Sequence, residues 1–169
     1  MAATERCETV PEITEIIKKY GDMLYRVCLL ELKNEADAED AVQETFIKYI
    51  KRPPLFSSDE HTKAWLVRVA VNQSRDIMRK RKIRACEDID ALSDKLAAEN
   101  EMDAGEGLIW QCLVKLPVKF SRVMILHFVE ELDCKTISKI IGRSESTVKR
   151  RIKEGRALFR EIYEKEILK

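Results

Sequence analysis

Residues 134–153 read CKTISKIIGRSESTVKRRIK, and this stretch decides the fold of the C-terminal part of the chain. A short apolar helix pattern ends at Gly142, which has no Cβ and can take the positive φ of a tight turn. Ser144 follows in the position that caps a second helix. Val148 and Ile152 lie four residues apart and predict one inward stripe on that helix. The stretch therefore predicts two helices joined by a tight turn.

The second of these helices is strongly basic. Between Arg143 and Arg160 there are seven basic and two acidic residues. A charge run alone indicates no more than a solvated helix face. Together with the preceding turn, however, it is typical of a helix-turn-helix, the unit that places one helix in the DNA major groove. We therefore expect the C-terminal part of the chain to bind duplex DNA.

Charge is also segregated along the rest of the 169 residues, although the net charge is only +1. Residues 75–84 contain six basic and one acidic residue, whereas residues 86–107 contain one basic and eight acidic residues. Residues 31–44 contain six acidic residues and one basic residue. The near-neutral total thus conceals separate basic and acidic surfaces.

Composition argues against several classes of protein. The chain is 45% hydrophobic with five Gly and four Pro, which favours a helical core. Its five cysteines are scattered without a CxxC pair, so we expect no disulfide and a reducing cytoplasm. The two histidines, His61 and His127, have no ligand-like neighbours, and we expect no metal or other cofactor. We also expect no signal peptide, no integral membrane segment, no catalytic site and no small-molecule substrate.

Hydrophobic periodicity predicts an all-α fold of two small helical domains. Apolar stripes run from Ile13 to Cys28 and from Ala38 to Tyr49, with Asn34 as a cap and Pro53-Pro54 as a stop. A third helix is expected over residues 62–81, and further helices over residues 108–114, 117–130 and 134–141 and from Ser144 to about residue 163. These helices define an N-terminal bundle (1–84) and a C-terminal four-helix domain (108–169), joined by a flexible acidic linker (85–107).

Three stretches, in this order, resemble bacterial sigma factors of the extracytoplasmic-function (ECF) class. Residues 37–46 (DAEDAVQETF) resemble the second conserved region of that family, and residues 64–72 (AWLVRVAVN) the start of its promoter-melting helix. Residues 116–156 resemble its C-terminal domain. The resemblance covers nearly the whole chain. It implies a non-catalytic cytoplasmic factor that binds core RNA polymerase and promoter DNA, both duplex and single-stranded, and that has an anti-sigma factor as a further partner.

The resemblance also implies three groups of site residues. The acidic helix would bind core polymerase through Asp37, Asp40, Gln43, Glu44 and Phe46. The −10 element would be bound by a loop and a basic helix, with the residues Ser57, Ser58, His61, Trp65, Arg68, Asn72, Arg75, Arg79 and Lys80. The −35 element would face the helix-turn-helix, with the residues Arg143, Ser146, Thr147, Lys149, Arg150, Lys153 and Arg156.

Several of these residues have a second interpretation. Trp65 and Phe46 are also expected to contribute to the core. Glu154 stands where relatives often carry a basic residue, and it could accept a hydrogen bond from a cytosine amine. Gly155 is expected to weaken the last helix locally.

Two other functions compete with the sigma-factor interpretation. A stand-alone helix-turn-helix regulator would explain the C-terminal half but would leave the first half unassigned. An all-α metal-dependent phosphohydrolase could use the carboxylate pairs Glu35/Glu39 and Asp40/Glu44, but the third helix offers no matching cluster.

The length of the linker fits two DNA elements on one face of a duplex. Its 23 residues span at most roughly 75–80 Å, and two helical turns of DNA measure about 70 Å. The resemblance implies that this acidic segment threads toward the active site of the polymerase and mimics RNA. In the free protein it would instead lie against the basic helices and weaken DNA binding.

Overall fold

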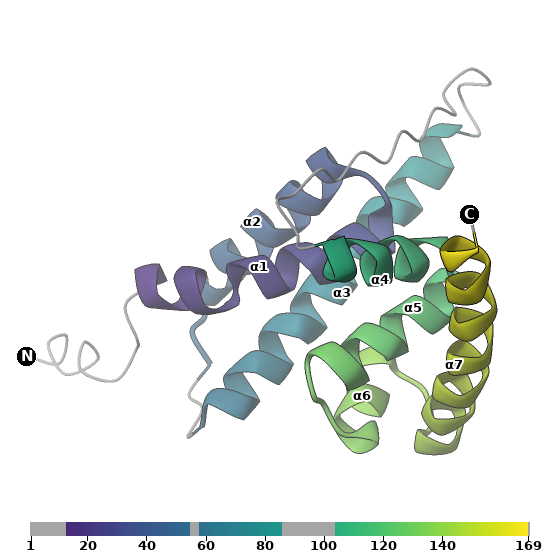
Figure 1. Cartoon of the computed structure of the whole chain (residues 1–169). Helices are drawn as coiled ribbons and strands as arrows, with labels where there is room; N and C mark the ends of the chain where they lie inside the picture. The colour runs from purple at the N-terminus through teal and green to yellow at the C-terminus, as the bar shows by residue number, and fades with distance from the viewer. Residues whose placement is uncertain (1–12, 55–57, 86–103, 169) are drawn as a thin grey trace, which may run out of the picture.

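The computed structural model describes residues 13–54, 58–85 and 104–168, which form helices joined by short turns (Figure 1). No β-strand occurs in these ranges, and the all-α prediction is confirmed. The elements in chain order are α1 (Ile13–Leu32), α2 (Glu35–Lys51), α3 (Asp59–Ala85), α4 (Ala104–Lys115), α5 (Val118–Met124), the π-helix η1 (Ile125–Val129), α6 (Cys134–Ile141) and α7 (Glu145–Ile167). The predicted flexible linker falls largely on residues 86–103, outside the described ranges.

Helices α1, α2 and α3 form the N-terminal bundle. The predicted stripe on α1 is confirmed, because Leu24 and Cys28 are completely buried. Lys33 then reverses the chain with a φ of 51°, a left-handed conformation that the sequence does not signal. Asn34 caps α2 as predicted, since its Oδ1 accepts a hydrogen bond of 2.9 Å from the Asp37 N–H.

Four helix boundaries differ from the periodicity-based prediction. Helix α3 spans Asp59–Ala85 rather than residues 62–81, α4 begins at Ala104 rather than residue 108, and α7 continues to Ile167. The added turns are polar or glycine-containing and carry no apolar stripe. Adding a residue to an existing helix costs much less than nucleating one, so a helix extends beyond the segment that its stripe marks.

The proline-led helix predicted over residues 117–130 is correct in extent but not in kind. Pro117 precedes α5, which continues directly into η1. In η1 the hydrogen bonds span five residues, as in the 3.0 Å bond from the Glu130 N–H to the Ile125 carbonyl. Such segments insert an extra residue into a helix and therefore rotate the side chains that follow.

Gly155 is a packing residue in α7 as well as a position of low helix propensity. It is buried, and a Cβ at this position would lie 3.2 Å from Cγ of Met124 on α5. Only glycine therefore lets α5 and α7 approach this closely without displacing Met124. The sequence predicted only a local weakening of the helix at Gly155 and gave no sign of this contact, which joins residues distant in sequence.

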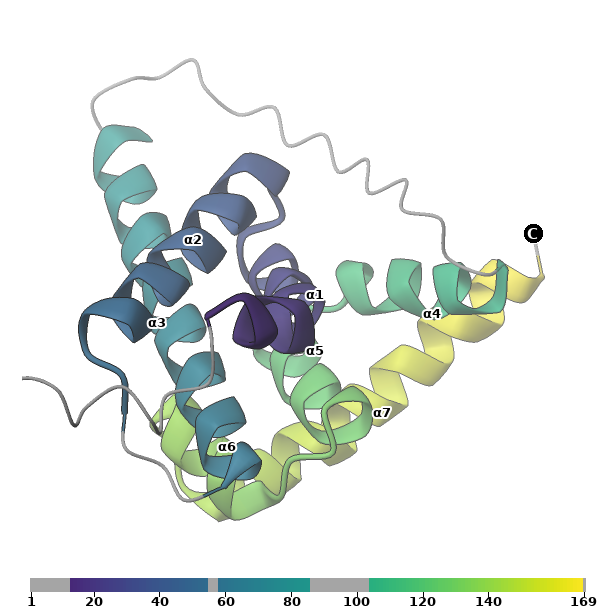
Figure 2. The same cartoon turned by 90° about the vertical axis from the view of Figure 1, so that its left-hand side faces the viewer.

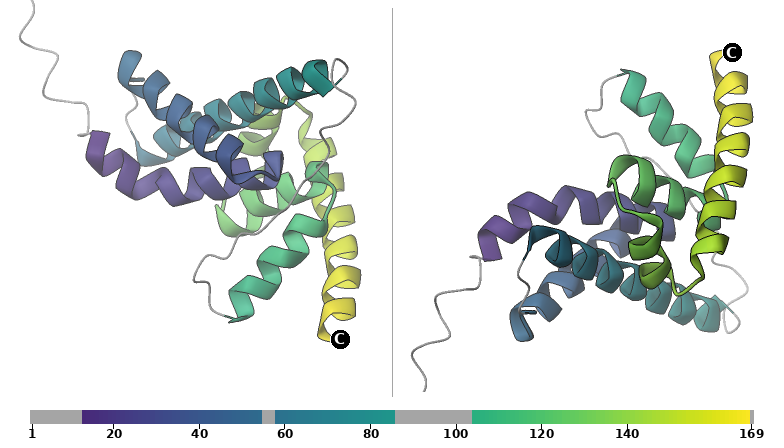
Figure 3. Two further views of the ribbon diagram at one scale, coloured as in Figure 1. Left: turned by 90° about the horizontal axis from the view of Figure 1, so that it is seen from above. Right: turned by 90° about the horizontal axis from the view of Figure 1, so that it is seen from below.

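The two domains pack against each other in this structure. Helix α6 lies alongside α3, and α5 contacts α1 (Figures 2 and 3). The buried carboxylate of Glu31 on α1 receives two hydrogen bonds from the Arg122 guanidinium on α5. Lys63 on α3 donates a 2.8 Å hydrogen bond to the carbonyl of Glu130 and lies 3.1 Å from its Oε2. These polar contacts orient the C-terminal domain against the bundle.

Candidate nucleic-acid interface

The helix-turn-helix has the predicted local geometry. Gly142 takes the left-handed conformation with φ 66° and ψ 44°, and Ser144 caps α7 by accepting a 3.3 Å hydrogen bond from the Thr147 N–H. Val148 and Ile152 point into the core, with 0% and 8% of their surfaces exposed. The turn, the cap and the inward stripe are therefore all confirmed, and they determine which side of α7 faces outward.

The outward side of α7 and its preceding turn carry the residues predicted for the −35 element. Arg143, Ser146, Lys149, Arg150, Lys153 and Arg156 are exposed, and Thr147 is half-buried. The hydroxyls of Ser146 and Thr147 lie 3.0 Å and 2.9 Å from Oγ of Ser144. Glu154 forms an ion pair of 3.8 Å with Arg150. The acid thus orients a neighbouring base on the same face, while the face as a whole remains cationic.

Helix α3 presents a second set of candidate residues along one side. His61, Trp65, Arg68, Asn72, Arg75 and Arg79 follow one another at spacings of four and three residues, which places them on a single helix face. Lys80 lies about 100° from Arg79 around the helix. At the start of α3, Oγ of Ser58 lies 2.8 Å from Nδ1 of His61. Ser57 is outside the described residues.

Exposure varies along this α3 face. Arg68 and Asn72 are exposed, whereas Trp65 is half-buried with its ring edge-on to Tyr49 at a centroid distance of 6.0 Å. Arg75 is also half-buried, because its Nη2 donates a 3.0 Å hydrogen bond to the carbonyl of Ile141, immediately before the turn at Gly142. The two candidate DNA faces therefore meet at Arg75.

The residues predicted for polymerase docking all lie on α2, but they differ in solvent exposure. Asp40 and Gln43 are exposed and Glu44 is half-buried, whereas Phe46 is only 7% exposed and belongs to the core. Asp37 is half-buried and forms an ion pair with Arg81 on α3. Phe46 and Asp37 therefore support the helix from inside, and the accessible face consists of the others.

Two residues of this accessible face were not predicted. Ile47 and Ile50 are 39% and 58% exposed, and together with Asp40 and Gln43 they follow helical spacing along one side of α2. The sequence did contain a signal: the buried stripe through Ala41 and Thr45 leaves both isoleucines on the other side. Both side chains therefore present apolar surface to solvent.

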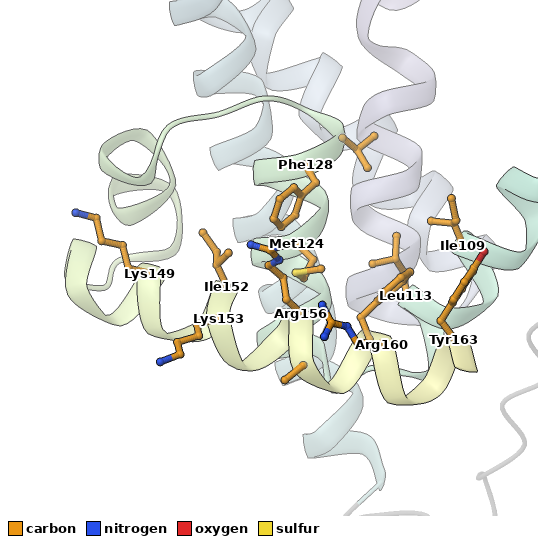
Figure 4. Close-up of a pocket in the computed structure, with 13 residues that line it drawn as sticks. Ile109, Leu113, Met124, Phe128, Lys149, Ile152, Lys153, Arg156, Arg160 and Tyr163 are labelled. Atoms are coloured by element: carbon orange, nitrogen blue, oxygen red, sulfur yellow. The ribbon is translucent and has the colours of Figure 1, made fainter. Parts of the chain in front are cut away.

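The C-terminal domain also contains an apolar hollow of about 910 Å³ that the sequence did not indicate (Figure 4). Its floor includes Met124 and Leu113, and Phe128 from η1 is 49% exposed beside it. Arg156 extends over the Phe128 ring at 5.8 Å, whereas Lys149 and Lys153 point away from the apolar side chains. The π-helix turns Phe128 toward this hollow, so a regular 3.6-residue pattern could not reveal it.

Other chemistries find little support in the described residues. No group of three or more His, Cys, Asp or Glu side chains is placed there to hold a metal ion, and no described helix is long and apolar enough to cross a membrane. Cys28, Cys112 and Cys134 are unpaired. Burial raises the pKa of the Cys28 thiol to about 12, and this cysteine serves as a small core residue, as predicted.

Comparison with known proteins covers both domains. Residues 16–84 match the family model for Sigma-70 region 2, and residues 106–159 match that for Sigma-70 region 4. The chain is 31% identical over 160 residues to the ECF RNA polymerase sigma factor SigW of Bacillus subtilis, covering 86% of each protein. It is 32% identical over 137 residues to the RNA polymerase sigma factor SigV of the same organism, covering 80% of this chain and 81% of SigV.

The fold is similar to those of solved sigma factors. The sigma factor RpoE from Bartonella quintana, crystallised with the anti-sigma factor NepR, superposes with a TM-score of 0.76 at 20% identity, covering 92% of this chain and 98% of RpoE. CnrH in complex with the cytosolic domain of CnrY gives a TM-score of 0.61 at 22% identity, covering 90% and 87%.

Proposed function

The chain belongs to the ECF sigma factor family and directs RNA polymerase to promoters, and we propose how its two domains divide this task. Residues 1–84 dock on core polymerase and recognise and melt the −10 element. Residues 108–169 bind the −35 element, and residues 85–107 connect the two. The ranges of the two family-model matches support this division.

We assign recognition of the −35 element to the outward face of α7. In this assignment Lys149 and Arg150, in the middle of the exposed face, contact base edges in the major groove. The other exposed cations and hydroxyls contact phosphates and set the register of the helix. The exposure of the whole set and the buried stripe opposite it support the assignment. Glu154 then restrains Arg150 through their 3.8 Å ion pair.

Capture of the −10 element is assigned to the α3 face defined above. Single-stranded DNA is bound by a cationic surface that follows the backbone together with groups that stack on or hydrogen-bond to bases. Arg68 supplies exposed charge, and Asn72 supplies an exposed amide in the middle of the same face. The edge-on packing of Trp65 with Tyr49 supports a dual role, with one side of the indole in the bundle.

The polymerase-docking surface is assigned to Asp40, Gln43, Glu44, Ile47 and Ile50. An apolar stripe bordered by acidic residues is suited to a partner helix that is apolar and basic. The exposure of both isoleucines is the observation that carries this assignment. It replaces Phe46, which is buried, as the apolar anchor of the surface.

Reconstitution with core RNA polymerase tests this docking surface. We expect the variant Ile47→Ser/Ile50→Ser to lose most co-purification with core enzyme and most run-off transcription while remaining folded. The control is Ile17→Ser, because Ile17 is an isoleucine of similar exposure, 45%, on a different helix, α1. Equal loss in the control, or full binding by the double variant, would refute the assignment.

The stand-alone regulator remains distinguishable by the same experiment, since such a protein would not bind core polymerase. The region 2 match over residues 16–84 already speaks against it. The family relationship also supports a cytoplasmic protein that acts without catalysing a reaction of its own.

The closed arrangement of the domains is proposed as the inactive state of the free protein. Arg75 and Arg143 are assigned to promoter elements about two helical turns apart, roughly 70 Å along the duplex. Here both line one cavity and cannot reach those elements together. The domains must therefore separate before promoter binding. An anti-sigma factor that favours the closed form would inhibit transcription; the structurally similar RpoE was crystallised with the anti-sigma factor NepR.

A further inference from the structure

A second cavity, of about 540 Å³, lies between the two domains and is cationic. We call it the interdomain cavity. It is bounded by the second half of α3, the start of α5, the turn between α6 and α7, and α7 itself. The residues that line it are Arg75, Met78, Val118, Lys119, Arg122, Ile141, Gly142, Arg143 and Arg151. Four guanidinium groups and one ammonium group thus converge on a space of the size that small ligands occupy, about 300–1,000 Å³.

Little negative charge balances these five cations. Within the described residues, only Arg122 forms a direct ion pair, with the buried Glu31, while Glu31 and Glu154 act electrostatically on Arg75 and Arg151. Arg75 instead donates to the uncharged carbonyl of Ile141 at 3.0 Å, and Lys119 lies over the Phe120 ring at 4.6 Å. The cluster therefore retains a large excess of positive charge in a partly desolvated space, where repulsion is screened less than at an open surface.

The ionisation behaviour of two of the arginines agrees with this picture. Burial lowers the pKa of Arg75, and the neighbouring charges of Arg122 and Arg143 lower it further, while Glu31 opposes them in part. The pKa of Arg151 is lowered in the same way, first by burial and then by Arg143 and Arg122. Because guanidinium groups stay protonated in proteins, the mutual repulsion persists until an anion relieves it.

We propose that the interdomain cavity binds a compact polyphosphate anion, either an inorganic polyphosphate or the phosphate chain of a nucleotide, which bridges the two domains. Guanidinium groups match phosphate oxygens in pairs of parallel hydrogen bonds, and four of the five cations are arginines. Arg75 comes from the N-terminal domain, and the other four come from the C-terminal domain. A bound polyphosphate therefore links α3 to α5 and α7.

This site goes beyond promoter recognition and gives the closed state a ligand. Arg75 and Arg143 belong both to the cavity and to the proposed DNA faces, so polyphosphate and promoter compete for them. Lys119 and Arg151 line the cavity but belong to neither proposed DNA face. These two residues therefore allow ligand binding to be tested separately from DNA contacts.

Calorimetric titration of the free full-length chain tests the proposal without polymerase. We expect inorganic triphosphate to bind at least about tenfold more tightly than sulfate at equal ionic strength, because several charged hydrogen bonds form at once. Parallel titrations with ATP and GTP identify the source: equal affinity indicates the phosphate chain alone, and tighter binding indicates a nucleotide. Binding of all these anions no tighter than sulfate overturns the proposal.

Paired substitutions locate the binding site. We expect Lys119→Met/Arg151→Met to weaken triphosphate binding about tenfold or more, since two charged contacts are lost. The control Lys18→Met/Lys165→Met removes the same charge from exposed positions outside the cavity and should change the affinity less than about twofold. Unchanged affinity in the first variant, or equal loss in the control, contradicts the assignment.

A second measurement tests the bridging role and needs no variant. Small-angle X-ray scattering of the wild-type chain should show a smaller radius of gyration with triphosphate than with sulfate at the same ionic strength. A larger radius with triphosphate would show that the anion separates the domains and would refute bridging.

Discussion

Gly142 and Gly155 show how one residue type serves two different physical needs. Gly142 has a φ of 66°, a backbone conformation that residues with a Cβ rarely adopt, and the local sequence indicates this requirement. Gly155 has ordinary helical geometry, and its need arises from Met124 on another helix. The first role was predicted correctly, whereas the packing role of Gly155 was not predicted.

The contact at Gly155 yields a stability prediction. In Gly155→Leu the new side chain must displace Met124 or push α7 away from α5. We expect overpacking to cost about 1–3 kcal/mol of unfolding free energy, more than the roughly 0.8 kcal/mol of helix propensity gained. Chemical denaturation measures the difference.

The control for this prediction is Glu161→Leu, an exposed position on the same helix. It should change the unfolding free energy by no more than about 0.5 kcal/mol. If Gly155→Leu were as stable as the wild type, the close approach of α5 and α7 would not restrict this position.

At the scale of elements, helical faces explain which candidate residues can act together. On α3 the spacing of four and three residues puts Arg68, Asn72 and Arg75 on one side, whereas Lys80 points elsewhere. The sequence resemblance alone grouped all four. Helix geometry therefore divides a list of candidates into those that can share a DNA strand and those that cannot.

This division predicts unequal effects on promoter opening. We expect Arg68→Ala/Asn72→Ala to reduce open-complex formation at least about tenfold, because a hydrogen bond to a charged group is worth about 1.5–3 kcal/mol and a neutral one about 0.5–1.5 kcal/mol. Lys80→Ala removes an exposed cation of the same helix and should have an effect below about threefold. Permanganate footprinting measures the melted strand in open complexes of reconstituted polymerase. Equal effects of the two variants would contradict the proposal that only the α3 face with Arg68 and Asn72 binds the strand.

Over the whole molecule, the Glu31–Arg122 pair is the polar contact with most consequence. Its side chains are only 1% and 12% exposed, and they come from different domains. Removing only one partner of a buried ion pair is costly, because the remaining charge is then buried without an opposite charge or solvating water. The pair therefore opposes domain separation in the closed form, although it contributes little to either domain alone.

Removal of Glu31 should open the molecule. In Glu31→Ala we expect the closed arrangement to lose about 3–5 kcal/mol relative to the open one. The radius of gyration of the free chain and its affinity for promoter duplex should both rise. Small-angle scattering and fluorescence anisotropy measure the two quantities.

Two controls accompany this experiment. Glu166→Ala breaks an ion pair with Lys115 inside the C-terminal domain and should leave the radius unchanged. Glu31→Leu/Arg122→Leu replaces both charges with apolar groups and should restore much of the closed form. Opening by the double variant to the same degree as by Glu31→Ala would show that the buried charge is not the cause.

Much of the fold could be predicted from local patterns. The α1 stripe, the Asn34 and Ser144 caps and the turn at Gly142 all depend on residues within a few positions of one another. Backbone sterics and hydrogen bonding act over that range, so short segments are sufficient to specify them. The family resemblance likewise depended on short motifs in order along the chain.

The features that local patterns did not reveal join residues far apart in the sequence. Examples are the contact of Gly155 with Met124, the register shift in η1 and the cavity between α3 and α7. Each depends on which helices contact each other and at what distance. Packing across the whole chain determines both. Helices and their faces thus follow from short-range chemistry, whereas the shared position of Arg75 and Arg143 arises only when two separately patterned domains close on each other.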